Sequence, residues 1–136
     1  MEYKDELIDI YGYQAEVFSK SYYMMGRLLD KRFVKNEIER RKWSDIYIYG
    51  GGYLGIQLYR AMSPIINVLS VVDKKGKLII DSLDDILIMD MDTFRKQYKS
   101  QPVIVTPLKF YREIYHELRK FVAEDKIIFL EEFGGR

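Results

Sequence analysis

The sequence predicts an α/β protein in which helices alternate with the strands of a parallel sheet. Two observations carry this prediction. From Ser44 onward, short β-branched and aromatic runs alternate with helical segments. The first of these runs stops at three consecutive glycines, Gly50–Gly52, where a helical segment then begins. The chain has 136 residues, of which 48% are hydrophobic, so it is long enough to bury a core.

The expected elements follow one another in a regular order. The early ones are a strand over Ile46–Tyr49, a helix over Leu54–Met62, a strand over Ile65–Val72 and a turn over Lys74–Lys77. Pro64, after Ser63, ends the first helix because proline cannot continue its hydrogen bonding. Two further strands are expected over Leu78–Ile80 and Ile86–Met91, followed by a helix that Asp92 caps and that runs to Tyr98. The last three elements are a strand over Val103–Val105, a helix over Phe110–Ala123 and a strand over Ile127–Leu130.

The first 43 residues have a different pattern and are predicted to form a helical extension, with the α/β domain in residues 44–136. An apolar stripe recurs at helical steps, at Leu7, Tyr11, Phe18, Tyr22, Met25, Leu29 and Phe33. Gly26 predicts a kink or a join between two helices. Several of the twelve tyrosines lie here, and their half-polar side chains suit either a subunit interface or packing on the chain's own sheet.

The glycines form a G-x-G-x-x-G pattern between a predicted strand and a predicted helix. Its residues are Gly50, Gly51, Gly52, Tyr53, Leu54 and Gly55. The first glycine of such a loop allows a tight turn, the second lets the backbone approach a pyrophosphate, and the third permits close helix–strand packing. The amide groups of the first helical turn then face the phosphates. The simpler alternative is a glycine-rich turn without a ligand.

An acidic residue completes the pattern. Asp73 directly follows the second strand, 18 residues after Gly55, where a dinucleotide-binding domain places the acid that binds the ribose hydroxyls. A carboxylate there favours NAD over NADP because it repels a 2′-phosphate, although Lys74 or Lys75 could neutralise such a phosphate. The loop fits a dinucleotide better than S-adenosylmethionine, whose loop usually begins with an acid.

Residues 45–131 resemble the Rossmann-type NAD(P)-binding domain of bacterial sugar-nucleotide and polysaccharide-biosynthesis proteins. The segments that carry the resemblance are Ile46–Gly55, Val71–Lys74, Val103–Pro107 and Ile127–Leu130. The resemblance implies about five parallel strands in the order 3-2-1-4-5, similar to the front half of nucleoside-diphosphate-sugar dehydratases and epimerases. It also implies that Thr106 and Pro107 lie near the middle of the cofactor, whereas a plain turn at the strand end is an equally good interpretation.

Catalytic groups are harder to find. Short-chain dehydrogenases and epimerases use Tyr-x-x-x-Lys for proton transfer, and no tyrosine here has a lysine at that spacing. Tyr23/Arg27 and Tyr115/Arg119 have arginine instead and are expected to be surface contacts. His116 is expected on the exposed side of its helix, opposite Ile114 and Leu118. The catalytic residues therefore stay unassigned.

Composition excludes several other classes. With 22 basic and 21 acidic residues, the chain is not expected to bind nucleic acid. No cysteine and one histidine argue against a metal site, and the aspartates between residues 81 and 92 do not have the spacing of a calcium loop. No membrane span and no signal sequence are predicted, so a cytoplasmic location is expected.

The sequence thus predicts an NAD(P)- or nucleotide-binding domain without its own catalytic half, related to sugar-nucleotide enzymes. Its ligand would be a nucleotide or nucleotide-sugar, and residues 1–43 would form a homodimer or dock a partner. The alternatives are a vacant Rossmann scaffold that serves as an interaction module, and part of a methyl- or glycosyltransferase. No length remains for a substrate domain.

Overall fold

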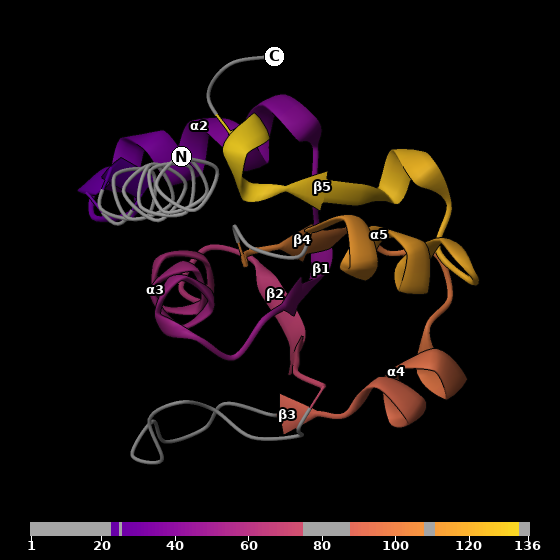
Figure 1. The fold of residues 1–136 in the computed structure, drawn as a ribbon. Coiled ribbons are helices and arrows are strands. Elements are labelled where there is room, and N and C mark those ends of the chain that lie inside the picture. Colours follow the sequence, from indigo (N-terminus) through magenta and orange to yellow (C-terminus); the bar gives the residue numbers. More distant parts are fainter. Residues whose placement is uncertain (1–22, 25, 75–87, 108–110, 134–136) are drawn as a thin grey trace, which may run out of the picture.

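The computed structural model describes residues 23–24, 26–74, 88–107 and 111–133, and their strands form a five-stranded parallel sheet (Figure 1). The strands are β1 (Asp45–Tyr49), β2 (Asn67–Val72), β3 (Ile88–Met89), β4 (Val103–Val105) and β5 (Ile127–Phe129). Their order is β3-β2-β1-β4-β5, and each neighbouring pair is parallel. The α/β fold class and the 3-2-1-4-5 order predicted from the sequence are confirmed.

Helices cover both faces of this sheet. They are α2 (Lys31–Arg41), α3 (Tyr53–Met62), α4 (Met91–Gln97) and α5 (Tyr111–Arg119), with short 3-10 turns η1 (Glu124–Lys126) and η2 (Leu130–Glu132). Figure 1 places α2 and α3 on one face and α4 and α5 on the other. A parallel sheet needs this cover because both of its faces are apolar.

Two predicted boundaries differ from the structure for local reasons. Strand β2 begins at Asn67 instead of Ile65, because the amides of Ile65 and Ile66 still donate to the carbonyl of Met62 at the end of α3. Helix α5 ends at Arg119, earlier than the predicted Ala123. The predicted strand over Leu78–Ile80 lies outside the described residues.

The predicted cap of α4 was wrong. Asp90, not Asp92, caps this helix: its Oδ1 accepts a hydrogen bond from the amide of Thr93 at 2.8 Å. Asp92 lies in the first turn, where an acid still suits the positive end of the helix dipole. Because the backbone at Asp90 leaves the strand to start the helix, β3 ends at Met89 and not at the predicted Met91. Residues 86 and 87 of the predicted strand lie outside the described residues.

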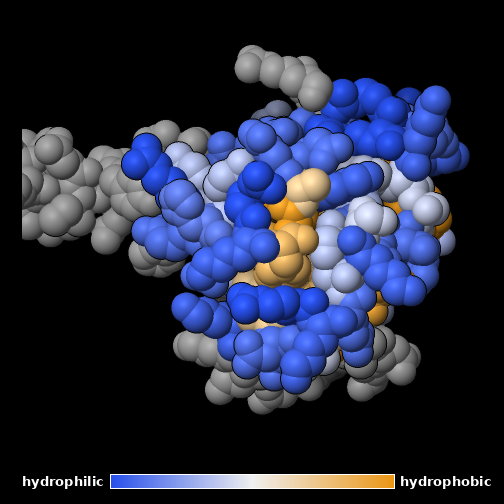
Figure 2. Space-filling model, turned by 90° about the vertical axis from the view of Figure 1, so that its right-hand side faces the viewer, coloured by the Kyte–Doolittle hydropathy of each residue, from blue (hydrophilic) through white to orange (hydrophobic). Residues whose placement is uncertain are grey.

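Two apolar clusters lie on opposite faces of the sheet. Along β1, Ile46 and Ile48 belong to the cluster under α2 and α3, whereas Tyr47 and Tyr49 belong to the cluster under α4 and α5. All four side chains are buried, as expected where successive strand residues point to opposite covered faces. Figure 2 shows the α4 and α5 side as mostly hydrophilic, with a narrow apolar strip at its centre.

Helix α2 shares the first of these cores. The ring of Phe33 meets the ring of Phe133 edge-on, with centroids 6.3 Å apart, and the Trp43 ring lies 5.7 Å from that of Phe133. The predicted boundary between residues 43 and 44 therefore falls between two elements, α2 and β1, that pack in one core.

The predicted apolar stripe of the extension was wrong at one described position. Leu29 is 76% exposed, whereas Met24 and Leu28 are buried. Residues 24 and 28 are one helical turn apart, so the side that packs on the core runs through them. The side that carries Leu29 stays uncovered by the described part of the chain.

Tyr98, which follows α4, makes the stability of the fold sensitive to alkaline pH. Burial, with the charge of Asp125 and the neighbouring Tyr47, raises the pKa of Tyr98 to about 12. The folded chain thus holds this proton more tightly than the unfolded chain, whose tyrosine titrates near pH 10. We expect the free energy of unfolding to fall as the pH rises from about 10 to 12, measured by urea unfolding at fixed pH.

The variant Tyr98→Phe tests this prediction. It loses the hydrogen bond from the Tyr98 hydroxyl to the carbonyl of Gln101, so it should be less stable by about 1 kcal/mol at pH 7. Its stability should then fall less steeply above pH 10 than that of the unmodified chain. Equal slopes would contradict the assignment. Some slope should persist, because burial also raises the pKa of Tyr47 and Tyr49.

Candidate functional site

The candidate site lies at the carboxyl ends of β1 and β4, where the direction of strand order changes. From β1 the chain continues through α3 to β2 on one side, and β4 then pairs with the other side of β1. Ligands of open α/β sheets bind at such a switch point. The sequence-predicted loop Gly50–Gly55 lies here, and backbone hydrogen bonds hold its start: Gly50 N donates to the carbonyl of Val72 at 2.7 Å.

Gly50 needs to be glycine for two reasons. Its φ is +116°, a conformation that side chains rarely adopt. A Cβ there would also stand 2.4 Å from Thr106 Oγ1 and 2.8 Å from Pro107 Cδ. The end of β1 therefore passes directly against the end of β4, and the first glycine of the pattern makes the tight turn that the sequence predicts.

Gly55 holds α3 against the same turn. A Cβ at this position would lie 1.8 Å from the carbonyl oxygen of Gly50, which is backbone and cannot move aside alone. The third glycine therefore sits where the pattern requires close helix–strand packing.

Gly52 differs from both, because a Cβ there would meet no atom within 4 Å. The residue is the N-cap of α3, and as a glycine it has no side chain to accept a hydrogen bond from the amide groups of this helix end. Those amides point out of the first turn and carry the positive end of the helix dipole. Open space in front of an uncapped helix end is the setting in which a phosphate group can bind.

Asp73 is brought to the loop by the pairing of β2 with β1. Its Oδ2 accepts a hydrogen bond from the amide of Gly51 at 2.8 Å, although the two residues are 22 positions apart. The Asp73 amide in turn donates to the carbonyl of Met89 at the end of β3. These two hydrogen bonds hold the Asp73 carboxylate next to the glycine loop. A carboxylate has about four acceptor sites, so one such group can accept several hydrogen bonds at once.

The other predicted site residues surround this centre in different ways. Thr106 is buried, and its Oγ1 donates to the carbonyl of Tyr49 at 2.9 Å, so it joins β4 to β1. Pro107 follows it and is half-buried beside Gly50. Tyr53 is 56% exposed at the start of α3, Leu54 is half-buried, and Lys74 is exposed next to Asp73. The structure therefore gathers these residues at one edge of the sheet.

Tyr49 is the last residue of β1, directly before the loop, and it was not identified as a site residue from the sequence. Burial raises the pKa of its phenol, and the negative charges of Asp73 and Glu117 raise it further. The group therefore stays protonated at neutral pH and does not act as a base. The alternating aromatic residues of β1 were the only sequence signal that could have found it.

The side chains rejected as catalytic have other roles or are exposed. Arg27 lies over the rings of Tyr23 and Phe33, at 5.9 and 4.1 Å from their centroids. Arg119 donates to the carbonyl of Val122 at 2.9 Å, beyond the end of α5. His116 is exposed, as predicted. Within the described part of the chain, no group of three His, Cys, Asp or Glu residues could hold a metal ion.

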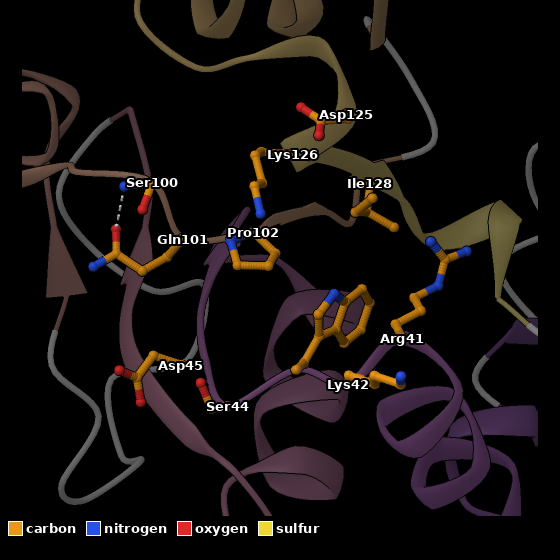
Figure 3. Close-up of a pocket in the computed structure, with 11 residues that line it drawn as sticks. Arg41, Lys42, Ser44, Asp45, Ser100, Gln101, Pro102, Asp125, Lys126 and Ile128 are labelled. Atoms are coloured by element: carbon orange, nitrogen blue, oxygen red, sulfur yellow. Dashed lines mark hydrogen bonds between the residues drawn. The ribbon is translucent and has the colours of Figure 1, made fainter.

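A cavity of about 580 Å³ lies at the opposite edge of the sheet from the glycine loop (Figure 3). It is formed by the segments that precede β1, β4 and β5, and Figure 3 shows Lys126 pointing toward Pro102 across it. Its lining includes the charged residues Arg41, Lys42, Asp45, Asp125 and Lys126. Arg41 is already bound to Glu37 at 2.5 Å, so the remaining charges nearly balance and favour no class of ligand.

The fold and the loop together define a Rossmann-like parallel α/β protein with a glycine loop at its switch point. The chain matches no protein-family model, no curated protein and no solved structure. None of the helices among residues 23–24, 26–74, 88–107 and 111–133 is long and apolar enough to cross a membrane.

Proposed function

We propose that the loop Gly50–Gly55 and Asp73 bind an NAD-type dinucleotide. The observation that carries this proposal is the hydrogen bond from Gly51 N to Asp73, which places the carboxylate beside the uncapped N-terminus of α3. The pyrophosphate would take the open space in front of Gly52, and the adenosine ribose would donate its hydroxyls to Asp73. NAD is favoured over NADP because Asp73 would repel a 2′-phosphate.

The wider role follows from what this chain offers chemically. The sequence contains no Tyr-x-x-x-Lys pair, and the candidate site supplies backbone amides, one carboxylate and a protonated phenol. Such a site can bind a nucleotide, and within the described part of the chain it offers no tyrosine paired with a lysine to transfer a proton. In this proposal the domain is the nucleotide-binding part of a sugar-nucleotide or polysaccharide-biosynthesis enzyme, whose catalytic groups come from elsewhere.

Calorimetric titration tests the proposal. NAD or NADH should bind with a Kd below millimolar, and NADP should bind more weakly. Asp73→Asn keeps an oxygen that can accept from Gly51 N but loses the charge, so we expect NAD binding to weaken about tenfold, as for one lost hydrogen bond to a charged group. The preference for NAD over NADP should shrink in the same variant.

Asp45→Asn is the matched control. Asp45 begins β1 at the other edge of the same sheet, where it accepts a hydrogen bond from Asn67, and its loss should leave NAD binding unchanged. If NAD, NADH, NADP and a nucleotide-sugar all fail to bind below millimolar, the proposal is wrong. Binding of S-adenosylmethionine in their place would make the loop that of a methyltransferase.

A further inference from the structure

An apolar groove of about 490 Å³ lies between α2 and α3, on the face of the sheet opposite α4 and α5. Its apolar lining residues are Leu28, Leu29, Ala61, Pro64 and Ile65. Two of them are large and exposed: Leu29 at 76% and Ile65 at 45%. Because both line the same groove, they form part of one exposed apolar patch, and such a patch marks an interaction surface.

The rim of this groove is positively charged. Among the described residues, the ionisable side chains that line it are Lys31, Lys35 and Arg60, with no aspartate or glutamate. Lys31 and Lys35 lie one turn apart on α2, and Arg60 faces the groove from α3. The groove therefore suits an apolar segment that carries acidic residues.

Residues 1–22 of the chain have this chemistry. They contain five acidic residues against two lysines, and the rest of the chain is basic, with 20 basic and 16 acidic residues. Leu7, Tyr11 and Phe18 recur at spacings of four and seven, which predicts one apolar face on a helix. The apolar and charged features of the segment thus complement those of the groove.

The helical segment that joins residues 1–22 to α2 favours docking between two copies of the chain. Tyr23, Met24 and residues 26–28 are helical, and the end of this helix, at Leu28 and Leu29, lines the groove. A helix that continued from Tyr23 back toward Leu7, as the apolar spacing predicts, could not turn back onto the groove of its own chain. We propose that residues 1–22 of one copy dock in the α2–α3 groove of a second copy, and that the reciprocal contact closes a two-fold dimer.

Sedimentation equilibrium of the full chain tests this proposal. We expect a dimer whose dissociation constant rises at least about tenfold in Lys35→Glu/Arg60→Glu, a variant that changes only exposed residues. Lys99→Glu/Arg112→Glu reverses the charge of one lysine and one arginine at exposed positions away from the groove, and it should leave the dissociation constant of the dimer unchanged. Glu6→Lys/Asp9→Lys should weaken the dimer alone and restore it when combined with Lys35→Glu/Arg60→Glu.

Crosslinking separates docking between copies from docking within one chain. The chain has no cysteine, so a Ser19→Cys chain can be mixed with a larger, tagged Gln57→Cys chain and treated with a bismaleimide. A covalent product that contains both chains supports the proposal. A monomer at all concentrations up to about 0.1 mM, a dimer insensitive to the groove variants, or crosslinking only within a Ser19→Cys/Gln57→Cys chain would overturn it.

Discussion

Gly55→Ala is expected to lower the free energy of unfolding by about 3 kcal/mol or more, which is enough to unfold much of a marginally stable domain. The added Cβ would lie 1.8 Å from the carbonyl oxygen of Gly50. Relief requires α3 to move away from the end of β1, and this would open the core that contains Ile56 and Leu58. Urea unfolding followed by circular dichroism measures the loss.

Gly52→Ala is the matched control in the same loop. Gly52 has a φ of −82° and a ψ of −169°, which alanine adopts without strain, and its Cβ would point into open space. We expect a change in stability within about 1 kcal/mol, the range for residues that differ as helix N-caps. The same variant should weaken NAD binding, because the methyl group takes space proposed for the pyrophosphate. Equal destabilisation by the two variants would contradict this account of the loop.

The sheet was predictable because its sequence signals are local. The strand Val103–Val105 was predicted with the bounds that the structure has, and Ile46–Tyr49 lacks only Asp45. Both are short apolar runs bounded by polar or glycine residues, and alternating helices leave few arrangements other than a parallel sheet. The predicted start of α4 was wrong because a single hydrogen bond, to Asp90, determines where this helix begins. Asp90 and Asp92 have the same propensity to cap a helix, so the sequence alone does not distinguish them.

The burial of individual helical side chains was less predictable. The apolar spacing predicted that Leu29 is buried, whereas the structure buries Leu28. Each of these neighbouring leucines fits a different apolar stripe along the helix, and only tertiary packing determines which stripe faces the core. Glu37 is a second example. The charge-rich helix α2 gives no sign that this glutamate is 2% exposed, a burial that depends on the guanidinium groups of Arg40 and Arg41 at 2.6 and 2.5 Å.

The geometry of the candidate site was predictable in part. The spacing of the glycines and the position of Asp73 after the second strand placed both at one edge of the sheet. The direct bond between Gly51 N and Asp73 was not predictable, since it depends on the register between β1 and β2. That register pairs Tyr49 with Val72, so the loop that follows Tyr49 leaves β1 beside Asp73, within reach of the Gly51 amide.

Phe94→Ala is the second substitution with a large expected effect, about 3–5 kcal/mol. Phe94 is fully buried in the middle of α4 and is the centre of an aromatic cluster. Its ring lies 4.7 Å from Tyr47 and 5.4 Å from both Tyr98 and Phe121. Removing it leaves a cavity that rigid rings cannot refill. The melting temperature, measured by calorimetry, should fall by about 10 °C or more.

Tyr111→Ala is the control for Phe94→Ala. Tyr111 is 47% exposed and meets the ring of Phe129 at 5.7 Å, so its loss should cost about 1 kcal/mol. Phe94 belongs to the cluster under α4 and α5, whereas Ile56 and Leu58, which hold α3 behind the glycine loop, belong to the other cluster. At a low temperature where Phe94→Ala is still folded, its affinity for NAD should therefore equal that of the unmodified chain. A fall in affinity in the folded variant would show that the two faces of the sheet are coupled through β1.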